Sequence, residues 1–87
     1  AMEYLLTATP IYIAKHMVIP INRLCIQTRA CGGFCIRGLV EPHAIVYSTS
    51  QGWRSIDVKG NEIRLQTLLQ EVSDLRECLQ NIELNPA

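Results

Sequence analysis

The sequence predicts a small α+β protein. An N-terminal β region of four to five short strands (residues 2–60) is followed by one C-terminal amphipathic, coiled-coil-like helix (residues 61–84). The first region is rich in Ile, Val, Tyr and Thr and is interrupted by glycines and prolines, as in short strands joined by turns. The second region contains neither Gly nor Pro, and its aliphatic residues recur at the coiled-coil spacing.

Within the β region, we expect strands near residues 5–13, 17–28, 34–40, 44–48 and 53–58. Residues 23–28 alternate between the two sides of such a strand. Pro20 cannot donate to a sheet ladder, so 17–28 is predicted to be an edge strand or two strands broken at the proline. The pair Gly32-Gly33 suits a two-residue hairpin turn, because glycine accepts positive φ.

The second region is predicted to be one helix, because Leu, Glu, Gln and Arg are good helix formers. Asn61 is a suitable N-cap, and Asn85-Pro86 would end the helix. A seam of aliphatic residues at positions a, d and e predicts an oligomer interface: Leu65, Leu68, Leu69, Val72, Leu75, Leu79 and Ile82.

This seam predicts a parallel homodimer, in which Glu71 of one helix faces Arg76 of the other. A trimer is the alternative, since the seam residues do not fix the number of helices. The same stripe would also suit a helix that packs on the sheet of its own chain. The composition favours association, because 48% of residues are hydrophobic and only 18% are charged.

Three of the four cysteines lie in the stretch CIQTRACGGFC at residues 25–35. Cys25, Cys31 and Cys35 with His43 or His16 would supply the atoms of a tetrahedral zinc site, but the spacing matches no familiar zinc motif. A disulfide between Cys31 and Cys35 across the glycine turn is another interpretation. The favoured interpretation is that of buried free thiols, so neither a metal nor a cofactor is predicted.

The sequence also bears on two other classes of function, nucleic-acid binding and catalysis. Four arginines of the β region, which carries six basic and three acidic residues, could contact nucleic acid: Arg23, Arg29, Arg37 and Arg54. The net charge of the whole chain is zero, so no global charge favours such a partner. No Cys-His pair, carboxylate pair or phosphate-binding loop has an informative spacing, and the protein is predicted not to be an enzyme.

The uncharged run at residues 4–14 is too short to span a bilayer and is preceded by Glu3 rather than by a basic segment. We therefore expect no membrane span and a cytoplasmic protein with reduced thiols. The predicted function is that of a non-catalytic, homo-oligomeric protein-interaction or scaffold module, assembled through its C-terminal helix and binding itself and another protein. The alternatives are a regulatory nucleic-acid-binding protein and a fragment of a viral or phage fibre-type assembly.

Overall fold

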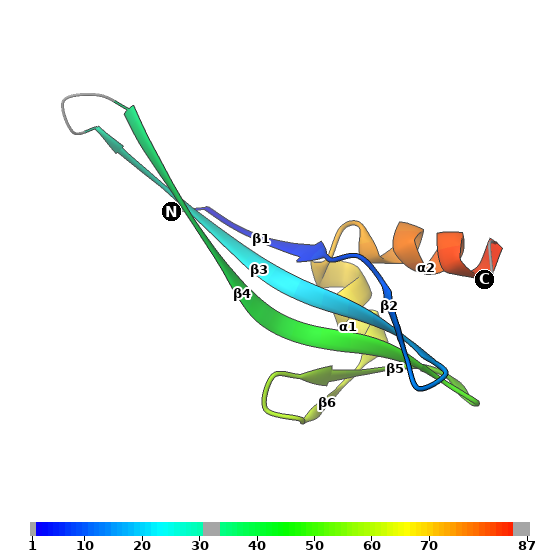
Figure 1. Cartoon of the computed structure of the whole chain (residues 1–87). Coiled ribbons are helices and arrows are strands. Elements are labelled where there is room, and N and C mark those ends of the chain that lie inside the picture. Colours follow the sequence, from blue (N-terminus) through cyan, green and yellow to red (C-terminus); the bar gives the residue numbers. More distant parts are fainter. Residues whose placement is uncertain (1, 31–33, 85–87) are drawn as a thin grey trace.

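The computed structural model of the chain describes residues 2–30 and 34–84, which form an antiparallel sheet with two short helices (Figure 1). The strand order is β1-β3-β4-β5-β6, and β2 pairs with β3 beside β1. In chain order the elements are β1 (Met2–Thr7), β2 (Ile11–Ile13), β3 (His16–Ala30), β4 (Phe34–Thr49), β5 (Gly52–Asp57), β6 (Glu62–Ile63), α1 (Leu65–Glu71) and α2 (Leu75–Leu84).

Two long strands, β3 and β4, dominate the molecule, so the prediction of four to five short strands is wrong. They have 15 and 16 residues, and together they form a twisted ribbon that extends well beyond the helices (Figure 1). We call the outer part of this ribbon, residues 25–30 and 34–41, the arm, and the remainder the body. The arm makes the molecule elongated, with extents of 55 × 28 × 24 Å.

The predicted strand break at Pro20 does not occur, because the missing N–H lies where no ladder bond is needed. Pro20 is opposite Ile45 of β4, but its carbonyl accepts a hydrogen bond of 2.8 Å from the N–H of Ala8. The N and O atoms of one strand residue point to the same side. The proline nitrogen therefore faces the segment between β1 and β2, which lies outside both ladders, and β3 continues through it.

The prediction of one long helix over 61–84 is also wrong. Residues 62–63 form β6, and the helical part is divided into α1 and α2 by Val72, which has extended φ and ψ of −107° and 105°. Asp74 lies in the break, where its carboxylate accepts hydrogen bonds from the N–H (3.2 Å) and the hydroxyl (2.8 Å) of Thr7 in β1. This long-range contact holds the chain at the break, and α2 begins at the next residue.

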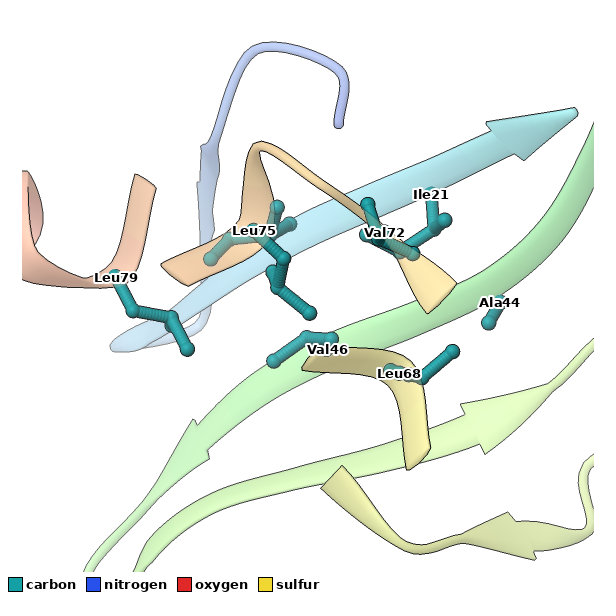
Figure 2. Close-up of a cluster of buried hydrophobic side chains, with 8 residues drawn as sticks. Ile21, Ala44, Val46, Leu68, Val72, Leu75 and Leu79 are labelled. Atoms are coloured by element: carbon teal, nitrogen blue, oxygen red, sulfur yellow. The ribbon is translucent and has the colours of Figure 1, made fainter. Parts of the chain in front are cut away.

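The core lies between the two helices and one face of the sheet (Figure 2). Strands β3 and β4 contribute Ile19, Ile21, Ala44 and Val46, and the helical segment contributes Leu68, Val72, Leu75 and Leu79, all at most 8% exposed. The heptad positions thus bury their side chains on the sheet of their own chain. The predicted coiled coil is wrong, because the described chain has two short helices separated at Val72 and no long helix that could form one.

A β-bulge separates the body from the arm. Ile21 is opposite Ala44, whereas Asn22 is opposite Pro42, so His43 has no partner across the ladder. The His43 imidazole lies 4.0 Å from the carboxylate of Glu71 in α1, an ion pair when the imidazole is protonated. In the part of the chain that the structure describes, no helix is long and apolar enough to cross a membrane.

Candidate functional site

The most prominent surface of the molecule is the face of the sheet that the helices leave open. On β3, Ile19 and Ile21 point to the helices, so the alternate residues point to the other face. Following the ladders from strand to strand assigns the described members of this uncovered face: Met2, Tyr4, Leu6, Ile11, Ile13, His16, Val18, Pro20, Asn22, Leu24, Ile26, Thr28, Gly38, Val40, Pro42, Ile45, Tyr47, Arg54, Ile56 and Glu62.

The uncovered face is mostly apolar and accessible to solvent. None of its members is buried, and Ile11, Ile13 and Ile45 are 49%, 55% and 39% exposed. At one end it is hollowed by an open depression of about 480 Å³, lined by Ile13, Ala14, His16, Val18, Ile45, Tyr47 and Ile56. Contiguous apolar surface of this kind is uncommon on a monomer and marks sites of interaction.

Few charges interrupt the uncovered face. Arg54 forms an ion pair with Glu62 of β6. The Nδ1 atom of His16 lies 2.7 Å from the carbonyl oxygen of Ser48, within hydrogen-bond distance. The chemistry of this face is therefore that of a surface that packs against another apolar surface.

The total accessible surface is large for the mass of the chain. It is 6556 Å², about 1,400 Å² more than the roughly 5,200 Å² expected of a compact 9.8 kDa monomer. The radius of gyration is 15.4 Å, against about 12 Å for a compact domain of this length. The arm and the uncovered face together leave more surface in water than a chain of this size normally does.

The structure does not bring the candidate metal ligands together among the residues that it describes. Cys25 is a free thiol that donates a hydrogen bond of 3.5 Å to Glu3. His43 lies four residues beyond Leu39, the partner of Cys25, or about 13 Å along the strand. Cys31 lies outside the described residues, as does the Cys35 side chain, so the candidate disulfide lies there too. No group of three metal-ligating side chains occurs in the described part of the chain.

The two cysteines whose side chains are described have little thiolate character. Burial raises the pKa of the Cys25 thiol, and its hydrogen bond to Glu3 raises it further. Burial also raises the pKa of the Cys78 thiol in α2, and the charge of Asp74 adds to this effect. Both side chains remain protonated at neutral pH, which disfavours a role as nucleophile or metal ligand.

The arginines predicted to contact nucleic acid lie on both faces of the sheet. Arg23 is on the helix side, where it forms an ion pair of 2.7 Å with Glu41. Arg54 is on the uncovered face and paired, as described above, and Arg37 is on the helix side of the arm. The side chain of Arg29 lies outside the described residues. The three described arginines therefore form no single basic patch.

The residues predicted to form an oligomer interface are occupied within the chain. Four of them belong to the core, and Leu65, Leu69 and Ile82 are partly buried against it. A different signal pointed to the uncovered face. The run VIPI at residues 18–21 is apolar at consecutive positions, the pattern of a strand covered on both faces.

No protein-family model, curated protein or solved structure matches the chain in sequence or fold.

Proposed function

We propose that the protein is a non-catalytic, homo-oligomeric interaction module whose uncovered sheet face packs against the same face of a second copy. The observation that supports it is the uncovered face itself, which is apolar, wide and without a covering helix in the described chain. The proposal keeps the self-association predicted from the composition. It replaces the helix seam, whose central residues are buried within the chain, by the sheet.

The shape of the face suits another sheet better than a small ligand. Ligand pockets combine apolar walls with a few convergent polar groups. The depression near Ile45 is open, and its only side chains with polar atoms are His16 and Tyr47. Two twisted sheets can instead pack face to face at a separation of about 10 Å, with their apolar side chains interdigitated.

A second copy is the partner that the area and the charges support. A stable interface of standard size buries about 800 Å² on each partner, which is less than the excess surface of about 1,400 Å². A twofold axis places the same patch on both sides of the contact. Because Arg54 is neutralised by Glu62, two such faces can meet without a strong charge repulsion.

Light scattering of the purified chain tests the proposal. We expect the wild type to have at least twice the mass of one chain, and Ile45→Lys to reduce this mass by placing a charge in the apolar depression of the uncovered face. Val58→Lys is the matched control, because Val58 is 62% exposed but follows β5 and lies outside the face. A monomeric wild type, or an Ile45→Lys variant of unchanged mass, would contradict the proposal.

A further inference from the structure

A second surface of the chain is available for association: the free edge of β4 in the arm. β5 pairs only with residues 44–49 of β4, so the edge of residues 37–41 that faces away from β3 has no partner strand in the described chain. Residues 37–40 are all exposed, and Leu39 and Val40 are 55% and 62% exposed. A row of backbone donors and acceptors therefore lies beside exposed apolar side chains.

This edge lacks the usual protection against pairing. Exposed edges are normally blunted by lysine, proline, a bulge or a covering loop. The segment RGLVE at residues 37–41 contains no lysine and no proline, and the nearest such features, Pro42 and the bulge at His43, come only where it ends. The edge is thus open over five residues and closed where the body begins.

The sequence of the segment is self-complementary in one antiparallel register. When Leu39 lies opposite Leu39 of a second copy, Arg37 lies opposite Glu41 of that copy, and Gly38 lies opposite Val40. Arg37 and Glu41 both point to the helix side, as their partners Gln27 and Arg23 on β3 require. Residues directly opposite each other share a face, so each arginine meets a carboxylate, twice by symmetry.

The local contacts leave room for these pairs. The Glu41 carboxylate is 42% exposed and accepts the Arg23 hydrogen bond at Oε2, which leaves Oε1 for a second cation. Arg37 forms no ion pair with any residue that the structure describes. A Cβ atom built on Gly38 would meet nothing within 4 Å, so the space beside it can accept Val40 of the second copy.

We propose that β4 pairs with β4 of a second copy along residues 37–41, about a twofold axis at Leu39, so that the two sheets become continuous. This contact uses the edge of the arm and does not depend on the uncovered face. Together, the two different twofold contacts would join at least four chains, as a closed tetramer or an open filament.

Cysteine cross-linking locates the twofold axis. In the full chain with its four native cysteines replaced by alanine, we expect Leu39→Cys to form a disulfide-linked dimer on mild oxidation. Opposed Cα atoms in an antiparallel pair are about 4.5–5.5 Å apart, within the range of a disulfide. The matched control is Gln27→Cys, which points to the same side but lies on β3, opposite Arg37 and away from the free edge of β4. Absence of the Leu39→Cys cross-link in folded protein, or equal cross-linking of the control, would overturn the proposal.

A charge variant tests the register without altering the cysteines. Arg37→Glu places like charges opposite each other twice, and we expect it to weaken the edge contact about ten-fold, measured as mass against concentration by sedimentation. Arg37→Lys should preserve the mass. Equal masses of the two variants would overturn the register.

Cross-linking of Leu39→Cys should also persist when Ile45→Lys is added, because the uncovered face takes no part in the edge contact. The edge contact and the proposed face contact can therefore fail independently. Loss of the cross-link in the folded double variant would show that the edge contact depends on the face.

Discussion

The two faces of the sheet are both apolar, but the residues that the structure describes cover only one of them. On β3, Ile19 and Ile21 are fully buried beneath the helices, whereas their neighbours Val18 and Pro20 on the other face are only partly buried. Burial of apolar side chains is the main favourable term in folding, at about 25 cal/mol per Å². The covered face therefore stabilises the monomer. Burial of the uncovered face would also be favourable, but this free energy is gained only when another surface packs against it.

The largest effect is expected from a change on the covered face. Leu75 is fully buried between α2 and the sheet, so Leu75→Ala should lower the free energy of unfolding by about 2–5 kcal/mol through lost burial and the cavity left behind. Leu6→Ala, at a 39% exposed position of the uncovered face, should cost far less under conditions where the protein is monomeric. Urea unfolding measures both values, and equal losses would contradict the comparison.

The next effect concerns the contact that divides the helices. Asp74→Ala removes the acceptor for the N–H and the hydroxyl of Thr7, and we expect a loss of about 1–3 kcal/mol of unfolding free energy. Glu77→Ala in the first turn of α2 is the control, because its exposed side chain should change stability by less than about 0.5 kcal/mol. Similar urea midpoints for both variants would show that the Asp74–Thr7 contact does not hold the helix break.

A third prediction uses concentration to separate the two faces. If the uncovered face is buried by self-association, the thermal midpoint of the wild type should rise with protein concentration, because association stabilises only the folded state. Ile45→Lys should remove most of this dependence, and Val58→Lys should retain it. Differential scanning fluorimetry over a dilution series measures the effect, and a wild-type midpoint that is independent of concentration would argue against the contact.

The smallest effect is expected at the turn that joins β5 to β6. The Asp57 carboxylate accepts hydrogen bonds of 2.9 Å from the N–H groups of Asn61 and Lys59, which lower its pKa below the ordinary value of 3.8. Because the folded state has the lower pKa, this stabilisation is complete above the unfolded pKa and is lost as the pH falls through the folded value. Asp57→Asn should lack this component of acid destabilisation. Identical acid unfolding curves for wild type and variant would refute it.

The sequence predicted the positions of many strands and of the helical region, but not the elements against which they pack. The predicted segments 34–40 and 44–48 fall within β4, and the heptad pattern marked the positions that are buried in the helical region. A stripe of aliphatic side chains looks alike whether it faces a second helix or a sheet, so the pattern could not decide between them. The helix break depends on the contact of Asp74 with Thr7, which is 67 residues away and leaves no local signal of its partner.

The candidate surface was harder to predict for a related reason. The uncovered face combines alternate residues of six strands, and its extent depends on ladder registers that no single segment determines. The register of β3 through Pro20, for example, depends on the distant Ala8. The local clue, an apolar run on both sides of β3, indicates that two faces are to be covered without identifying what covers them.

The bulge at His43 changes which residues of β4 face the helices. In the body its even-numbered residues, Ala44 and Val46, face the helices, and in the arm its odd-numbered residues, such as Leu39, face the same side. Because His43 is an extra residue in the strand, the helix side is occupied by odd-numbered residues before it and by even-numbered residues after it. Deleting His43 would place Pro42 next to Ala44, so the pairs Ile21–Ala44 and Asn22–Pro42 would follow each other in a regular ladder, and every side chain of the arm would keep its present side. The strand therefore accommodates the extra residue without changing the pairs on either side of it, and the sides of β4 residues in both arm and body follow the unbroken alternation of β3.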